Sequence, residues 1–336
     1  MRIGNLDTDK KVVVIAEIGN NHEGDIVLAK EMINAAAESG ADAVKFQTII
    51  PNRLVSSIKE QRIEQLSKFS FSPEQFVDLK NVADRQDVQF LSTPFDLEVV
   101  DWLTPLVPAF KVASGDNDFW PLLEKIALTG KPMMISLGLG RLLEATKLQK
   151  YIENIWATNS ITYPGLALLH CMVSYPTPDN EARLRDIEKI RFKNVTPGYS
   201  DHTMGIKAAE LAVACGARIV EKHFTLNKNH SDFRDHQLSA DPIELKSLVN
   251  AIEDVEKFLG KDDGLIGNCE KENFTAMGRS IASNRDIPIG ETISTSDICW
   301  VRPRIGLKPG EEHLIIGKKL SSPIKEGDFF SLNHFK

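Results

Sequence analysis

The sequence predicts an α/β protein: a (β/α)8 TIM barrel followed by a small β-rich domain at the carboxyl end. Eight short apolar runs, of the kind found in buried parallel strands, alternate with segments of helical periodicity in the first 260 residues. Eight strand–helix repeats in about 250 residues match the size of such a barrel. Beyond them, short β-like pieces are separated by many glycine and proline residues.

The eight predicted strands are rich in Val, Ile, Leu and Ala. They are Val12–Ile18, Ala43–Phe46, Val88–Leu91, Ala109–Val112, Pro132–Leu137, Leu166–Cys171, Val195–Tyr199 and Ala217–Val220. Between them, Asp25 is a predicted helix N-cap, and Ser72 with Gln75 forms a predicted capping box. Glycines that can end a helix in the left-handed conformation follow three of the predicted helices. These are Gly130, Gly216 and Gly260.

The predicted domains are a catalytic barrel at residues 1–262, a linker at 263–277 and the β-rich domain at 278–336. About 60 residues with so many helix and strand breakers bury little core, so docking on a barrel would stabilise this domain. The long polar connection 51–71 is expected to carry a short helix and to act as a lid. A doubly wound sheet is the rival fold, but residues 18–22 do not form the Gly-rich phosphate loop that it would need.

Composition and charge exclude several classes of protein. The 40 Lys and Arg residues face 47 Asp and Glu residues, and the net charge of −7 argues against binding to nucleic acid through overall charge. The apolar runs are too short to span a membrane, and we expect no signal peptide, because charged residues follow the start without a long apolar segment. The four cysteines form no CxxC pair, so we expect no zinc site or disulfide framework, but buried free thiols in a reducing cytoplasm.

Residues suited to catalysis and binding follow the predicted strands. They are Glu17, Asn21, His22, Glu23, Lys45, Gln47, Ser92, Thr93, Lys111, Ser114, Asp116, Ser136, His170, Ser174, Tyr175, Ser200, Asp201, His202, Glu221, Lys222 and His223. The loops that follow the strands of a barrel build its active site, so we expect these side chains at one mouth. Lysines with hydroxyl groups are typical of sites for phosphorylated anions. Without an anionic ligand, Lys45 and Lys111 would repel each other.

His202 and His223 end two neighbouring predicted strands. Neighbouring strands lie about 5 Å apart, so the two imidazoles can share one divalent cation. Two nitrogen ligands leave positions open for Lewis-acid chemistry on a carbonyl group. An acid/base pair that uses no metal is the alternative interpretation.

The same residues carry a resemblance to the sialic acid synthase family, which condenses phosphoenolpyruvate with N-acylated sugars to make nonulosonic acids. The motifs are AEIGNNHEGD (16–25), KFQT (45–48), STPFD (92–96), KVASGDN (111–117), LLHCMVSYPTP (168–178), GYSDHTMG (198–205), EKHFTL (221–226) and DHQLS (235–239). The stretches GRSIASNRDIPIGETIS (278–294) and VRP (301–303) resemble the antifreeze-like (SAF) domain of that family. The resemblance covers nearly the whole chain.

The resemblance implies a role for each group of residues. His202 and His223 would bind Mn²⁺, Mg²⁺ or Co²⁺, which polarises the aldehyde of the open-chain sugar. The phosphate and carboxylate of phosphoenolpyruvate would be held by Lys45, Thr93, Lys111, Ser114, Ser136 and Ser200. Acid, base and metal-bound-water roles fall to Glu17, Glu221 and Asp235, without a division among them. Gln47, Tyr175 and Asp116 would contact the sugar, and Ser174 is a further expected substrate contact.

The resemblance also implies a domain-swapped homodimer in which the antifreeze-like domain covers the partner's barrel. Arg302 would then reach a substrate of the other subunit. Taken by itself, an arginine at this position is more typical of an ion pair at the rim of a site. Phosphoenolpyruvate and an N-acylated amino sugar are the expected small-molecule partners, with no nucleic acid and no membrane.

The chain departs from the family pattern at two positions. It has Ser136-Leu137-Gly138 where the family has Ser-Thr-Gly, so one hydroxyl is expected to be lost from the site. Asp116 stands where synthases that use N-acetylmannosamine have Glu. The SGDN version resembles the legionaminic acid synthases, which use 2,4-diacetamido-2,4,6-trideoxy-mannose. An N-acetylneuraminate or pseudaminate synthase is the alternative within the family.

Two other classes of function were weighed against a condensing synthase. A barrel aldolase would form a Schiff base on one desolvated lysine and needs no metal, whereas this sequence offers two lysines and a histidine pair. An ice- or carbohydrate-binding protein could use the antifreeze-like tail, but it would not need the polar residues at the barrel mouth.

Overall fold

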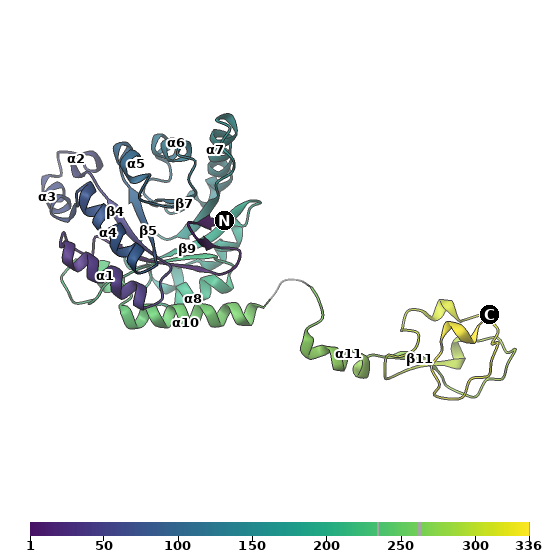
Figure 1. Cartoon of the computed structure of the whole chain (residues 1–336). Helices are drawn as coiled ribbons and strands as arrows, with labels where there is room; N and C mark the ends of the chain where they lie inside the picture. Colours follow the sequence, from purple (N-terminus) through teal and green to yellow (C-terminus); the bar gives the residue numbers. More distant parts are fainter. Residues whose placement is uncertain (234, 261–263, 336) are drawn as a thin grey trace. The chain divides into compact units, whose positions relative to one another are not determined.

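The chain forms two units, Met1–Gly260 and residues 261–336. The computed structural model describes residues 1–233, 235–260 and 264–335. Each unit is described by itself (Figure 1).

Eight parallel strands form the centre of the first unit. They are β3 (Val13–Gly19), β4 (Ala43–Thr48), β5 (Gln89–Pro94), β6 (Phe110–Val112), β7 (Met133–Ser136), β8 (Leu166–Cys171), β9 (Val195–Asp201) and β10 (Ile219–His223). Hydrogen bonds join them in the order β5-β4-β3-β10-β9-β8-β7-β6. Strands β5 and β6, at the two ends of this order, contact each other and nearly close the barrel. The predicted (β/α)8 fold is therefore confirmed.

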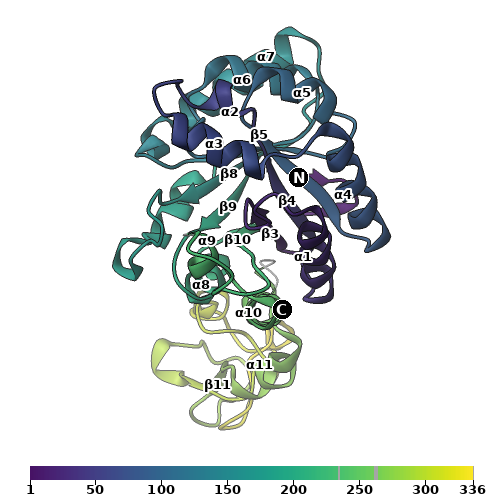
Figure 2. The ribbon, with the colours of Figure 1, turned by 90° about the vertical axis from the view of Figure 1, so that its left-hand side faces the viewer.

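Helices surround the strands (Figure 2). They are α1 (Ile26–Glu38), α2 (Pro51–Leu54), α3 (Glu60–Phe69), α4 (Pro73–Arg85), α5 (Leu97–Leu103), α6 (Trp120–Leu128), α7 (Ala145–Thr158), α8 (Lys207–Ala214), α9 (Asp235–Leu238) and α10 (Pro242–Leu259). The sixth repeat differs from the expectation, because the 3-10 helix η3 (Leu184–Ile190) stands where an α-helix was predicted. It begins after Arg183, whose backbone is left-handed.

The predicted helix ends are confirmed, with one exception, by their hydrogen bonds and backbone angles. The carboxylate of Asp25 accepts hydrogen bonds from the first turn of α1. Ser72 and Gln75 form the predicted capping box of α4 through both of its hydrogen bonds. Gly130 after α6 and Gly216 after α8 have positive φ angles, as the predicted helix stops require. Gly260 after α10 has a φ of 64° but a ψ of −153°, which lies outside the left-handed helical region, so the prediction was wrong for that residue.

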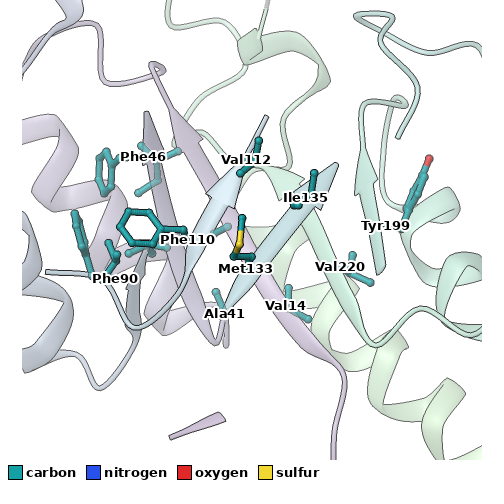
Figure 3. Close-up of a cluster of buried hydrophobic side chains, with 14 of the residues drawn as sticks. Val14, Ala41, Phe46, Phe90, Phe110, Val112, Met133, Ile135, Tyr199 and Val220 are labelled. Atoms are coloured by element: carbon teal, nitrogen blue, oxygen red, sulfur yellow. The ribbon is translucent and has the colours of Figure 1, made fainter. Parts of the chain in front are cut away.

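Side chains on the outer face of the strands pack against the helices. Phe46, Phe90, Phe110 and Tyr199 belong to this cluster, and all four are buried (Figure 3). Inside the barrel, a second apolar cluster fills the end at which the strands begin. It consists of Ile3, Val13, Ile15, Ala43, Leu91, Ala109, Met134, Ala167, Leu169 and Ile219. Ile3 comes from the hairpin of β1 (Arg2–Ile3) and β2 (Leu6–Asp7), so this hairpin contributes to the closed end of the barrel.

The second unit has a small core around an antiparallel pair of strands, β11 (Ser280–Ser283) and β12 (Ile298–Val301). Isoleucines from both strands and from the segments around them fill that core together with Leu320 and Phe330. The segment predicted as a linker, 263–277, contains helix α11 (Lys271–Met277). The sequence did not reveal this helix, because seven residues are too few to show a helical apolar period and none of them is buried.

All four cysteines are free. Cys171 is buried, but Cys269 is exposed, so the expectation of buried thiols was wrong for that residue. Within the described ranges, we find no helix with the length and apolar character needed to cross a membrane.

Candidate active site

A polar cavity of ≈ 460 Å³ opens at the end of the barrel where the strands terminate. Side chains of a β-strand alternate between its two faces, so every second residue of each strand points into the barrel. Seven residues expected at the mouth do not line the cavity: Asn21, His22, Glu23, Ser92, His170, Asp201 and Lys222. Of these, Ser92, His170, Asp201 and Lys222 fall on the outer faces of their strands. The lining does contain every residue to which the family resemblance gives a role, except Ser174 and Arg302. These are Glu17, Lys45, Gln47, Thr93, Lys111, Ser114, Asp116, Ser136, Tyr175, Ser200, His202, Glu221, His223 and Asp235.

The two exceptions have separate structural causes. Ser174 lies beyond the end of β8 in an exposed turn, where its hydroxyl donates to the carbonyl of Pro176 at 2.9 Å. Ser174 is therefore not placed in the cavity, contrary to the expectation. Arg302 belongs to the second unit, where its guanidinium contacts the sulfur of Met277 at 3.5 Å.

Two lysines and two glutamates form a buried charge cluster in the cavity. The Nζ atom of Lys45 lies 2.7 Å from Glu17 Oε2 and 3.7 Å from Glu221 Oε2. Lys111 Nζ lies 3.7 Å from Glu221 Oε1. The expected repulsion is present, since Lys45 lowers the pKa of Lys111, but the two carboxylates offset it without an anionic ligand.

The cluster shifts the pKa values of its members in different directions. Burial raises the pKa of Glu17, and the nearby Glu221 adds to this, although Lys45 opposes it. Burial also lowers the pKa of Lys111, whereas Glu221 opposes that change. Burial works against ionisation of Glu221 too, but Lys111 and Lys45 hold its pKa below the usual range. Glu17 is thus the carboxyl group of the cluster that keeps a proton most readily.

Hydroxyl groups accompany both lysines. Lys45 donates to the hydroxyl of Thr93 at 3.1 Å, and Lys111 donates to that of Ser136 at 2.8 Å. The hydroxyl of Ser200 donates to Glu221 at 2.9 Å. Ammonium and hydroxyl donors at this spacing can bind a phosphate or a carboxylate with charge-assisted hydrogen bonds.

The imidazoles of His202 and His223 lie next to each other, with ring centroids 5.4 Å apart. His202 Nδ1 is 2.7 Å from the carbonyl oxygen of Met172, so Nδ1 carries the proton and Nε2 keeps its lone pair. Burial lowers the pKa of His202, which favours this neutral, ligating form. The ring of Tyr175 lies 4.2 Å from that of His202.

Two imidazoles beside carboxylates, with His202 held neutral, fit a divalent cation. A carbonyl partner on the second ring nitrogen is the usual way to orient a metal-binding histidine. In the described parts of the chain, no group of three or more His, Cys, Asp or Glu residues is placed to hold a metal. A cation held by His202 and His223 would therefore take its remaining ligands from water and substrate.

Leu137, which stands where the family has Thr, points away from the cavity. Its side chain is buried in the outer core and lines a separate hollow with Leu139 and Leu142. The expectation that this change removes a hydroxyl from the site was therefore wrong. The neighbouring Gly138 leaves no room for a side chain, because a Cβ there would lie 2.6 Å from the Cβ of Ser114.

Sequence reasoning missed several residues that line the cavity. Arg62 comes from α3, and Leu54 from α2, both within the connection that was expected to carry one short helix. Phe233 precedes the predicted Asp235, and Asn20 follows β3. Only the unusual length of the connection 51–71 pointed toward Arg62, because no strand ends there.

The loop between β3 and α1 contacts two segments that border the cavity, α3 and the start of α9. Gly24 has a φ of +87°, and a Cβ there would lie 2.0 Å from the carbonyl oxygen of Lys68 at the end of α3. His22 stacks on Phe71 with ring centroids 4.2 Å apart. On the other side, Glu23 Oε1 lies 3.0 Å from Nε2 of the buried His236, next to Asp235. The loop thereby holds α3 and the start of α9 in place.

Comparison with known proteins connects this geometry to one family. The profile of the NeuB family matches residues 32–264, and that of the SAF domain matches residues 278–336. The chain is 36% identical to an N,N'-diacetyllegionaminic acid synthase from Campylobacter jejuni, over 95% of this chain and 98% of that protein. It is 34% identical to a pseudaminic acid synthase from the same species, over 100% of both chains.

A solved structure is similar as well. It is an N-acetylneuraminic acid (sialic acid) synthetase from Leptospira borgpetersenii in complex with citrate, which is 32% identical to this chain. The match has a TM-score of 0.74 and covers 81% of this chain and 94% of that one.

Asp116 provides a test of the electrostatics. Burial, with a contribution from Asp118, raises the pKa of Asp116 to about 6 from 3.8. The folded state thus binds this proton more tightly than the unfolded chain, so ionisation costs stability as the pH rises from about 4 to about 6. We predict that the unfolding free energy of Asp116→Asn, relative to that of wild type, rises by about 1 kcal/mol between pH 4 and pH 6. This value is smaller than the full pKa shift implies, because the group is partly exposed to solvent.

Urea unfolding of both proteins across this pH range measures the effect. Asp78→Asn is the control, since the side chain of Asp78 is 61% exposed, and it should show a smaller change with pH. A difference between Asp116→Asn and wild type that does not vary with pH would contradict the prediction.

Proposed function

The chain belongs to the NeuB family, and we propose on this basis that it is a nonulosonic acid synthase. It would condense phosphoenolpyruvate with an N-acylated, mannose-type aldehyde sugar and release phosphate. The observation that carries the proposal is the cavity itself, in which two buried lysines with hydroxyl partners share the lining with two adjacent histidines. Anion binding and carbonyl activation are thus available in one space.

Phosphoenolpyruvate would bind at the lysine side of the cavity. Lys45 and Lys111 supply positive charge, and the buried hydroxyls of Thr93, Ser136 and Ser200 supply further donors. Ser114, also in the lining, completes this set. When the anion arrives, the lysine–carboxylate contacts at 3.7 Å can lengthen at little cost, because they are longer than a direct hydrogen bond.

His202 and His223 would hold Mn²⁺, Mg²⁺ or Co²⁺ through their ring nitrogens. A divalent cation supplies Lewis-acid polarisation of the sugar aldehyde when it is bound. The chain's own contribution is to hold the His202 ring: the carbonyl of Met172 fixes its tautomer, and Tyr175 packs against it.

The proposed reaction balances as phosphoenolpyruvate, aldehyde and water giving a 2-keto sugar acid and inorganic phosphate. Carbon 3 of the enol attacks the aldehyde carbon, and the aldehyde oxygen takes up a proton. Water adds to carbon 2, and the C–O bond to phosphate then breaks as the ketone forms. Glu17, Glu221 and Asp235 line the cavity and are the candidates for moving these protons. Glu17, with its raised pKa, fits the proton donor best.

Asp116, Gln47 and Tyr175 would contact the sugar. Atom Oδ2 of Asp116 is buried, and the described residues give it no hydrogen-bond partner. Gln47 donates to Glu17 at 3.1 Å and accepts from Asn20 at 2.9 Å, so it connects the sugar side to the charge cluster. Among the possible substrates we favour 2,4-diacetamido-2,4,6-trideoxy-mannose, supported by the Asp116 motif and the similarity to N,N'-diacetyllegionaminic acid synthase.

The proposal includes a domain-swapped homodimer, in which Arg302 would reach the cavity of the partner subunit. Its support is the SAF domain and the exposed position of Arg302. Nucleic acid and membranes have no part in the proposed reaction. We place the reaction in the cytoplasm, which suits four thiols that form no disulfide.

The first prediction tests the reaction and the metal together. Purified protein given Mn²⁺, phosphoenolpyruvate and the diacetamido sugar should release phosphate, and EDTA should stop the release. His223→Ala removes one of two protein ligands, so metal content and turnover should both fall by at least about 100-fold. His230→Ala is a matched control outside the lining, because its ring lies beside His236 instead.

Activity that survives both EDTA and His223→Ala would remove the metal from the proposal. If borohydride trapped pyruvate on Lys45 or Lys111, the result would favour a Schiff-base aldolase over the proposed synthase.

The second prediction concerns the sugar. Wild-type protein should have a higher kcat/KM for 2,4-diacetamido-2,4,6-trideoxy-mannose than for N-acetylmannosamine, with the latter still detectable. A site that makes no hydrogen bond to a 6-hydroxyl discriminates only weakly against a sugar that has one. Asp116→Glu should shift the ratio toward N-acetylmannosamine by up to about tenfold. A wild-type preference for N-acetylmannosamine would refute the subgroup and leave the synthase proposal standing.

The third prediction tests the swapped dimer. His202→Ala and Arg302→Ala should each be inactive alone, but their co-expression should recover activity. If Arg302 acts on the partner's cavity, a mixed dimer has one site with both lesions and one wild-type site. Random assembly then gives about a quarter of wild-type activity. Absence of recovery in dimers shown to be mixed would mean that Arg302 does not act across the dimer.

A further inference from the structure

A buried ion pair lies behind the two histidines, on the face of the barrel wall that points away from the cavity. Lys222 Nζ is 2.9 Å from Asp201 Oδ2, and both side chains are 0% exposed. Asp201 precedes His202, and Lys222 precedes His223. Because side chains alternate along a strand, the histidines line the cavity while this pair does not.

The pair joins the two strands that carry the histidines. Asp201 and Lys222 are register partners in the parallel ladder of β9 and β10. The ion pair thus adds a side-chain connection exactly where the backbone pairing of the two strands ends. Beyond it, backbone hydrogen bonds within this ladder no longer fix His202 relative to His223.

The same two side chains hold the residue that follows His202. Asp201 Oδ1 accepts a hydrogen bond from the backbone N–H of Thr203 at 2.9 Å. Lys222 donates to the backbone carbonyl of Thr203 at 2.6 Å. The backbone of His202 is therefore fixed on both sides, by Asp201 before it and by Thr203 after it. The hydroxyl of Tyr199 donates to Asp201 at 3.1 Å and completes the network.

Stability alone is a weak explanation for such a pair. Removing two charges from water is costly, and apolar residues of the same volume often stabilise a core equally well. Outer partners that orient metal-binding histidines, by contrast, have large effects on metal affinity. We propose that Asp201 and Lys222 are positioning residues that set the relative placement of the His202 and His223 imidazoles, and thereby the affinity for a divalent cation.

This inference rests on the proposed metal site, and its test measures binding of Mn²⁺ alone to the full-length protein. Electron paramagnetic resonance counts free Mn²⁺ during a titration of metal-stripped protein. Lys222→Met removes the donor to Thr203 and should raise the Kd about 10–100-fold. Asp201→Asn/Lys222→Met also removes that donor but leaves no buried charge unpaired, so it provides a folded variant if the single change disrupts the protein. The same increase in Kd is expected.

Arg218→Met is the matched control. Arg218 lies just before β10, and it forms an ion pair with Glu256 at 2.8 Å at the opposite end of that strand. Its loss should lower the thermal stability but leave the Kd for Mn²⁺ within about threefold of wild type.

The outcomes separate the two proposals. Suppose that wild type binds Mn²⁺ and that a folded Lys222→Met or Asp201→Asn/Lys222→Met variant binds it with a Kd within threefold of wild type. The positioning role is then overturned, while the metal site stands. If wild type binds no Mn²⁺, or binds it as tightly after His223→Ala, the metal site is overturned and the positioning role with it.

Discussion

The alternation of side chains along eight parallel strands is the constraint on which the rest of the structure depends. It sends apolar residues such as Phe46 and Phe110 outward to the helices, and it sends Glu17, Lys45 and Glu221 inward. A shift of one residue in any strand would exchange its two faces, burying charge among the helices. The backbone pairing therefore fixes both the core and the composition of the cavity, and neither can change without the other.

Within the cavity, charge balance explains how the protein tolerates so many buried ionisable groups. Lys45 bridges Glu17 and Glu221, and Lys111 lies near Glu221. Each lysine has a carboxylate nearby, so the cluster avoids the cost of an unpaired buried charge. An anion that binds to the lysines adds negative charge beside Glu17, which further favours protonation of that carboxyl. In the proposed reaction, anion binding would thereby keep a proton on Glu17 for transfer.

The site could be predicted from the sequence because strand ends in this fold converge at one mouth. Residues such as Lys45, Lys111 and His223 could be identified from their side-chain chemistry and from their position at the strand ends. It failed where placement depends on something other than strand order. Arg62 reaches the cavity through the packing of α3, and Ser174 leaves it because the chain turns after β8. Leu137 was assigned to the wrong face, since a motif shows which residues are adjacent but not which way each one points.

The apolar plug at the closed end of the barrel has a consequence for hydration. Val13, Leu91, Met134 and Leu169 are 0% exposed, and the β1–β2 hairpin contributes Ile3 to the same cluster. Among the described residues, these apolar side chains separate the cavity from the polar groups of Met1, Thr8 and Thr196 at the closed end, so we expect water to exchange with the cavity mainly through its mouth. A ligand that fills the mouth would trap whatever solvent remains beneath it. The number of water molecules that can take part in any reaction there is then set by how the ligand fits, not by bulk solvent.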